Sequence, residues 1–302
     1  MTTRNPMLGP RILARTLTVP ASGSGRPYQF GNVWQYHSRS DRHSKVACWG
    51  LVLDLLIECP LLRAHVQAGK VRLGINHELR DFRNAKKKNL DLVLCRATSG
   101  RIEAGGSRAG AAGVRDFAGL VGRYGIRLTR AEHKALSQLP TLPIASVATV
   151  LVAAEAKAAM TAFLKARPRL KDELSSSHQT IHGDNQHAIA AGLVLINAAQ
   201  TFVSPDLNKH DLKQAAPVVS AHRQPQDAQK IVDGLRELQR RSSVADSGFD
   251  ALGVIVLDCR NDGTTVAHVT AHPPAPPATD DFDYARFVHR LAHLYATRFS
   301  EL

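Results

Sequence analysis

The chain has 302 residues, which is enough for one large domain or two small ones with a sizeable hydrophobic core. Hydrophobic residues make up 44% of it, yet no apolar run approaches the ~18 residues that span a bilayer, so we expect no membrane contact. The formal charge of +13 and the isoelectric point of about 10.0 indicate a polyanionic partner, most often nucleic acid, although a generally basic proteome gives the same balance.

We interpret residues 1–45 as a basic N-terminal arm. The first forty residues contain no aspartate or glutamate and are rich in proline and glycine. This composition favours a flexible segment that lies along phosphates. It is also typical of an organellar transit peptide, but the stretch lacks a clear amphipathic helix. The arginines of the arm are Arg4, Arg11, Arg15, Arg26 and Arg39.

A strongly apolar stretch over residues 46–62 predicts a buried helix. Its only acids are Asp54 and Glu58, which are four residues apart and therefore share a helical face. Either these acids are a solvated stripe on the helix, or one of them is a catalytic carboxylate. Glu58 is the first candidate for that role and Asp54 the second. Residues 70–76 then alternate in polarity and predict a strand, and residues 90–95 predict another.

A basic turn separates these two strands, and Asp91 follows it within the second strand. Apolar neighbours on both sides indicate that Asp91 is buried. A buried, unpaired carboxylate is costly, so Asp91 needs a metal or a cation as its partner. Pairing with a nearby lysine at the strand edge is the simpler alternative. The cations of the turn are Arg80, Arg83, Lys86, Lys87 and Lys88.

Residues 97–143 are predicted to be an insertion, because they begin with an irregular stretch rich in glycine, alanine and arginine. Within the insertion, Thr129 and Glu132 fit a capping box that begins a helix running to about Leu139. Two prolines, Pro140 and Pro143, end this helix. The insertion therefore separates the Asp91 strand from the next predicted strand.

Residues 144–154 predict a strand that leads into Glu155-Ala-Lys157. The main alternative is a single alanine-rich helix over residues 148–164, which would place Glu155 and Lys157 on nearly opposite faces. The β-branched residues that precede the glutamate favour the strand. These residues are Val147, Thr149, Val150 and Val152.

The remaining chain begins with a basic segment, which is either a charged loop or a grip on the substrate backbone. Its cations are Lys165, Arg167, Arg169 and Lys171. The further elements that we expect are a helix from Asp172 to about His182, a segment over 188–199 that is either helix or buried strand, a helix over 226–241, a strand over 252–257 with a hairpin partner over 264–270, a proline-rich linker over 271–280 and an amphipathic C-terminal helix over 281–302.

This order of elements predicts an α/β fold with a central mixed sheet flanked by helices, over a core of residues 46–270. Side chains on a strand alternate between its faces, so Glu155 and Lys157 would point the same way. Asp91 on a neighbouring strand would complete a cluster of two carboxylates and one ammonium. Such a cluster suits a divalent metal that activates water against a phosphodiester.

An aspartate near a strand end, followed later by Glu-x-Lys on another strand, resembles the PD-(D/E)xK nuclease superfamily. The resemblance implies a restriction-endonuclease-like fold, with Asp91 and Glu155 as metal ligands and Lys157 as the residue that activates water. It also implies a further acid from the preceding helix, for which Glu58 is the candidate. The residue before Asp91 is Leu90, where the family pattern has proline.

The resemblance implies a Mg²⁺-dependent hydrolase of phosphodiester bonds, a DNA endonuclease of the restriction or repair type, with Mn²⁺ as an alternative metal. Double-stranded DNA is then the expected partner, and cutting palindromic sites would require a homodimer. The alternative function is a non-catalytic nucleic-acid-binding or assembly protein that retains the fold. The residues expected to bind nucleic acid are Lys86, Lys87, Lys88, Lys165, Arg167 and Arg169.

Other chemistries find little support in the sequence. His178 and His182 have the spacing of a zinc-protease motif, but Gln179 replaces the glutamate that would act as general base. The chain has no Walker A motif and no dinucleotide-binding fingerprint. Its four cysteines form no C-x-x-C pair, so we expect buried, reduced thiols in a cytoplasmic protein.

Overall fold

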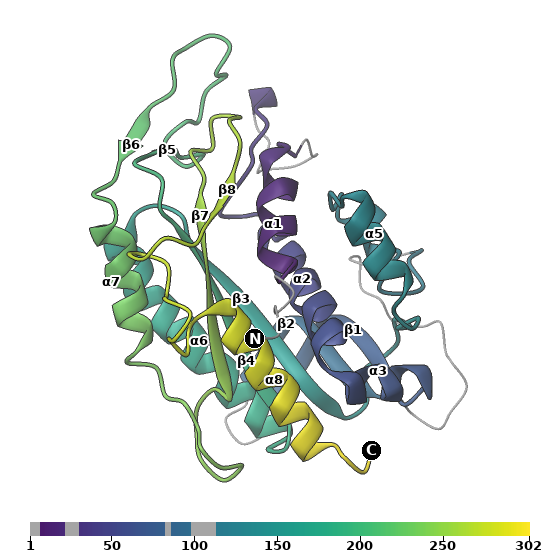
Figure 1. Ribbon diagram of the computed structural model, residues 1–302. Coiled ribbons are helices and arrows are strands. Elements are labelled where there is room, and N and C mark those ends of the chain that lie inside the picture. Colours follow the sequence, from purple (N-terminus) through teal and green to yellow (C-terminus); the bar gives the residue numbers. More distant parts are fainter. Residues whose placement is uncertain (1–6, 22–29, 82–85, 98–112) are drawn as a thin grey trace.

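A computed structural model describes residues 7–21, 30–81, 86–97 and 113–302 of the chain (Figure 1). A six-stranded mixed sheet, with the strand order β1-β2-β3-β4-β7-β8, forms its centre. The strands are β1 (Val71–Asp81), β2 (Lys86–Arg96), β3 (Val150–Ala159), β4 (Ile189–Asn197), β7 (Ala251–Asp258) and β8 (Ala267–Val269). Strands β5 (Thr201–Val203) and β6 (Val219–Ala221) form a separate two-stranded sheet.

The sheet changes from antiparallel to parallel at β3. Strands β1, β2 and β3 are successive antiparallel neighbours, whereas β4 lies parallel to both β3 and β7. Parallel neighbours need crossover connections, and helix α6 (Phe163–Asp184) supplies the one between β3 and β4. The fold therefore places β3 between a hairpin partner and a crossover partner.

Helices cover both faces of the sheet. Helices α1 (Gly9–Thr18), α2 (Arg42–Glu58), α3 (Pro60–Gln67) and α8 (Tyr284–Arg298) share one hydrophobic cluster, and α6 and α7 (Gln226–Leu235) share the other. Figure 1 shows these two groups on opposite sides of the sheet. The short helices α4 (Leu120–Arg123) and α5 (Arg130–Ser137) join the first group through the buried Leu120 and its neighbours.

Alternation along β3 distributes its side chains between the two clusters. Ala154 and Ala156 belong to the cluster with α2, whereas Ala153 and Ala159 belong to the cluster with α6. Glu155 and Lys157 have the same parity as Ala153, so they point to the α6 face. A strand is confirmed here and a single alanine-rich helix is excluded, but β3 begins six residues later than the predicted 144–154 and continues past Glu155.

The α/β class with a mixed central sheet flanked by helices is confirmed, as is the capping box of Thr129 and Glu132 at the start of α5. The ambiguous segment over 188–199 is the buried strand β4. The apolar stretch over 46–62 is two helices rather than one, because Cys59 is extended and Pro60 begins α3.

The structure contradicts the flexible N-terminal arm over residues 9–18 and the loop alternative for the basic segment after Glu155. Residues 9–18 were expected in a flexible arm, but they form α1, whose Ile12, Leu13 and Leu17 are buried against α2. The basic segment around Pro168 is not a loop, because α6 begins at Phe163 and includes it. In both cases regularly spaced apolar residues lie between the arginines and lysines, and their burial stabilises a helix.

Two further expectations concern membranes and thiols. Among the described residues, no helix is long and apolar enough to cross a membrane. All four cysteines are buried and free of disulfides, as predicted. Burial raises the pKa of Cys48, Cys95 and Cys259, which keeps these thiols protonated and unreactive.

Candidate active site

The three residues of the predicted cluster lie on β2 and β3, where these two strands stop pairing. The last residues paired here are Leu92 with Ala154, so Asp91 and Glu155 are one step beyond the ladder. The Oδ2 of Asp91 accepts a hydrogen bond of 3.1 Å from the backbone N–H of Ala156. The Asp91 side chain therefore makes a hydrogen bond to β3 at a place where the backbones of β2 and β3 are no longer paired.

Helix α2 contacts Asp91 from the other side. Ser44, in the first turn of α2, donates a hydrogen bond of 3.2 Å to the Oδ1 of Asp91. Each oxygen of Asp91 thus accepts one hydrogen bond from the protein. A carboxylate oxygen can accept more than one, and Asp91 is partly exposed, so a further partner can bind it. The N-terminal end of α2 therefore positions the Asp91 carboxylate next to β3.

Glu155 is the most deeply buried member of the cluster, with 2% of its surface exposed. Its Oε1 forms a short ion pair with the Nζ of Lys157 and lies 4.0 Å from the Nζ of Lys88. Its Oε2 is buried and has no hydrogen-bond partner among the described residues. An unpartnered buried carboxylate oxygen is costly, and a bound cation would remove that cost.

Lys88 and Glu173 complete a run of alternating charges. The Nζ of Lys88 also donates to the backbone carbonyl of Glu173 (2.6 Å) and to the hydroxyl of Ser177, both on α6. Glu173 in turn places its Oε2 3.8 Å from the Nζ of Lys157. Helix α6 therefore holds both lysines in place beside Glu155.

The pKa shifts in this cluster follow from burial and from mutual repulsion of the acids. Burial raises the pKa of Asp91, and burial together with the charge of Asp91 raises the pKa of Glu155. Burial alone would lower the pKa of Lys157, but the charges of Glu155 and Asp91 outweigh it and raise that pKa. Lys157 is therefore an ammonium at neutral pH, and the acids gain from any additional cation.

The two acids of α2 do not reach this cluster. Glu58 is fourteen residues beyond Ser44, about 20 Å farther along the helix, and its Oε2 lies 3.2 Å from the Nε2 of His289. Asp54 is buried and accepts hydrogen bonds from the N–H groups of Leu8 and Gly9. The structure therefore does not bring Glu58 to the cluster, because the helix end that meets Asp91 carries Ser44.

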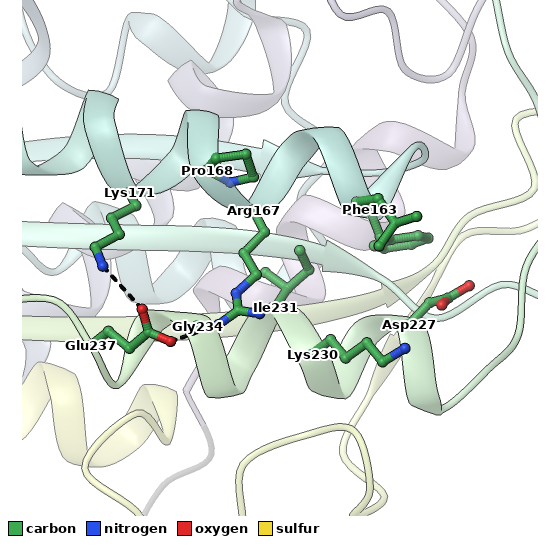
Figure 2. Close-up of a pocket in the computed structure, with 10 residues that line it drawn as sticks. Phe163, Arg167, Pro168, Lys171, Asp227, Lys230, Ile231, Gly234 and Glu237 are labelled. Carbon is green, nitrogen blue, oxygen red and sulfur yellow. Dashed lines mark hydrogen bonds and ion pairs between the residues drawn. The ribbon is translucent and has the colours of Figure 1, made fainter.

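The basic residues of α6 divide between two faces of the helix. Arg167 and Lys171 are four residues apart, and both form ion pairs with Glu237 of α7 at 2.6 and 3.0 Å. Figure 2 shows them at a groove of about 380 Å³ between α6 and α7. Lys165 and Arg169 share a different face, on the side of Glu173.

The lysines predicted to lie in a basic turn, Lys86 to Lys88, instead form the start of β2 and differ in their surroundings. Lys87 is exposed and lies 3.9 Å from Glu78, so it is accessible to a polyanion. Lys88 points inward to Glu155 rather than outward to solvent. The side chain of Lys86 lies outside the described residues, as does Arg83.

Sequence reasoning missed Ser44, Glu173 and the inward position of Lys88. Ser44 lies just before the apolar run that predicts α2, and nothing in the local pattern links it to Asp91. Glu173 lies four residues after Arg169, a spacing that predicts an ion pair only if both residues belong to one helix. The sequence pattern begins that helix at Asp172, after Arg169. These residues depend on tertiary contacts between α2, β2 and α6.

The two carboxylates of Asp91 and Glu155 suit Mg²⁺ better than a structural Zn²⁺ ion. Among the described residues, no group of three or more histidine, cysteine or acidic side chains is gathered for a metal ion. Two carboxylates are the usual protein share of a Mg²⁺ site, which keeps several waters, whereas structural Zn²⁺ takes four protein ligands.

Comparison with protein-family models, with curated proteins and with solved structures finds no match to this chain.

Proposed function

We propose that this chain is a metal-dependent nuclease that hydrolyses phosphodiester bonds of double-stranded DNA, with a fold like that of the restriction endonucleases. One observation carries the proposal: Asp91 accepts a hydrogen bond from the N–H of Ala156, which lies between the paired Glu155 and Lys157, and the Oε2 of Glu155 has no partner among the described residues. The charge of +13 supports a polyanionic substrate.

Asp91 and Glu155 would hold Mg²⁺ or Mn²⁺, each offering an oxygen that is not committed to a strong protein donor. The bound ion supplies a water of lowered pKa and charge for the phosphate oxygens. The protein's own contribution is to fix both carboxylates in place. Ser44 and the N–H of Ala156 orient Asp91, and Lys157 holds the Oε1 of Glu155.

Lys157 has a second role in this proposal. It is one-quarter exposed, so its ammonium faces both the buried Glu155 and the solvent from which a phosphate would approach. A fixed positive charge stabilises the additional negative charge that develops on the phosphate during attack by water. Lys88, which is more buried, compensates the charge of Glu155 from the other side.

The test is plasmid cleavage in Mg²⁺ or Mn²⁺ by the full chain and three variants. We expect Glu155→Gln and Lys157→Met to lose at least about a hundredfold in cleavage rate, the cost of removing one group that stabilises a transition state. Glu58→Gln is the matched control, because it removes an acid about 20 Å along α2 from the site and should cleave at the wild-type rate.

Circular dichroism and urea unfolding of each variant show whether the fold survives. Equal cleavage by the wild type and by a folded Glu155→Gln would overturn the proposed site. Salt-sensitive DNA binding without any metal-dependent cleavage by the wild type would instead support the non-catalytic binding protein.

A further inference from the structure

A second pocket, of about 200 Å³, lies next to the candidate active site, where the chain leaves β3 and enters α6. We call it the α6 pocket and define it by Tyr36, Ala158, Lys165, Arg169, Ser204 and Asp206, which are among its lining residues. Ala158 directly follows Lys157 on β3. The pocket therefore adjoins the cluster of Asp91, Glu155 and Lys157 without including it.

The first turn of α6 forms one wall of this pocket. Helix α6 has 22 residues, its N-cap residue Ala162 makes no side-chain capping hydrogen bond, and its first turn contains no acid. The N-terminus of a long helix carries a partial positive charge and N–H groups without helical partners. This end is consequently suited to a negatively charged group.

Tyr36 is an independent indication of a ligand in the pocket. It is 92% buried, since 8% of its surface is exposed, and its hydroxyl has no hydrogen-bond partner among the described residues. Burial raises the pKa of Tyr36 to about 12, so the hydroxyl keeps its proton at neutral pH and is available as a donor. The charges of Arg169 and Asp206, both in the pocket wall, act on the same phenol.

Two cations face the pocket from α6. Lys165 is exposed and has no ion pair among the described residues. Arg169 donates a hydrogen bond of 3.2 Å to the carbonyl of Ala158, and its Nε lies 3.9 Å from Glu173. Because Glu173 also contacts Lys157, charged contacts connect the pocket to the candidate active site.

Asp206 is the only carboxylate among the residues that line the pocket, and it accepts a hydrogen bond of 3.1 Å from Ser38. Its charge would repel an anion placed beside it. An anion would therefore sit at the α6 side, near Lys165 and Arg169, and removing the charge of Asp206 would strengthen its binding.

We propose that the α6 pocket binds a phosphate group of the nucleic-acid strand that is cut at Asp91, Glu155 and Lys157. This inference rests on the proposed function and adds a second anchoring point for the substrate. The phosphate is either the terminal phosphomonoester of a strand end or an internal phosphodiester. Both offer the same oxygens to the helix end, the two cations and the tyrosine hydroxyl.

The experiment measures fluorescence anisotropy of short DNA duplexes in EDTA, so that binding is separated from cleavage. The duplexes are identical except that their ends carry a 5′ phosphate, a 3′ phosphate or hydroxyls only. The variants are Lys165→Gln, Tyr36→Phe and Asp206→Asn. Lys230→Gln is the matched control, because Lys230 is also an exposed helical lysine without an ion pair among the described residues, but lines the other groove.

We expect Lys165→Gln and Tyr36→Phe to weaken binding about tenfold and Lys230→Gln to weaken it less than about twofold. Asp206→Asn should strengthen it. If the loss is confined to one phosphorylated duplex, the pocket takes a terminal phosphate; if all three duplexes lose equally, it takes an internal one. Tyr36→Phe should leave the urea midpoint unchanged or higher, since the hydroxyl has no protein partner to lose.

The inference is overturned if the wild type binds none of the duplexes, or if Lys165→Gln and Lys230→Gln have equal effects and Tyr36→Phe has none. Failure of the proposed function gives a different result. In that case the binding effects of Lys165→Gln and Tyr36→Phe persist, but the wild type cuts no DNA in Mg²⁺ or Mn²⁺.

Discussion

Asp54 shows how a residue with a catalytic spacing serves the fold instead. Its two oxygens accept hydrogen bonds of 2.8 Å from the N–H groups of Leu8 and Gly9, at the start of α1, and Oδ2 also accepts one from the hydroxyl of Tyr284. Burial raises its pKa to about 6, although these hydrogen bonds oppose the shift. Asp54 therefore links α1, α2 and α8.

This raised pKa predicts a pH dependence of stability. Well below pH 3.8, Asp54 is protonated in both the folded and the unfolded chain. Between its ordinary pKa of 3.8 and the folded pKa of about 6, only the unfolded chain loses the proton. The free energy of unfolding should therefore fall by about 3 kcal/mol as pH rises through this window, and stay level above it as far as Asp54 is concerned.

Urea unfolding from below pH 3.8 to pH 7 measures the effect. Asp91 and Glu155 also have raised pKa values, so the wild type alone does not isolate Asp54. The difference between the wild type and Asp54→Asn does, because the variant keeps the other carboxyls. An identical slope in both proteins would contradict the assignment.

At the residue scale, sequence alternation could predict the central pair of the site but not its support. Glu155 and Lys157 share a face because they are two residues apart on a strand, and the structure confirms their contact. The resemblance points to Glu58 because it lies in a helical segment before the first strand. Only the crossing of α2 over the sheet determines that its first turn, with Ser44, meets Asp91.

At the element scale, α1 and α2 cross at a pair of glycines. A Cβ on Gly50 would come within 2.8 Å of the Cα of Gly9, closer than real contacts allow. Gly50→Ala should therefore push the helices apart and lower the free energy of unfolding by about 1–3 kcal/mol, the usual cost of overpacking.

Gly122→Ala in α4 is the control for this substitution. A Cβ on Gly122 would meet nothing within 4 Å, so we expect a neutral or slightly stabilising effect. Urea unfolding of both variants gives the comparison. Equal stability of Gly50→Ala and the wild type would show that the two helices do not cross as closely as described.

The elements that could be predicted are those whose local pattern agrees with their tertiary setting. The capping box of α5 and the β-branched run before Glu155 belong to this group. Helix α6 does not, because Pro168 favours a break in a local interpretation. Burial of Phe163, Ala166 and Leu170 on one face nevertheless extends the helix through it. A hydrophobic face can therefore outweigh a local proline.

At the scale of the whole molecule, both ends of the described chain belong to the same core. Helix α1 and helix α8 each pack in the cluster that covers one face of the sheet. The composition of the first forty residues predicts an arm because it is rich in arginine and free of acids. It does not show that the apolar residues between the arginines are spaced to form a buried helix face. Long-range packing of this kind, like the order of the six strands, cannot be read from local patterns.

The central claim is that Asp91 and Glu155 together bind one divalent metal ion. Calorimetric titration of the apo protein with Mn²⁺ at neutral pH measures this directly. We predict one site in the wild type and in Glu58→Gln, with affinity that rises with pH as the two acids lose their protons. The site should be lost in Asp91→Asn and in Glu155→Gln. Unchanged Mn²⁺ affinity in a folded Glu155→Gln would contradict the account.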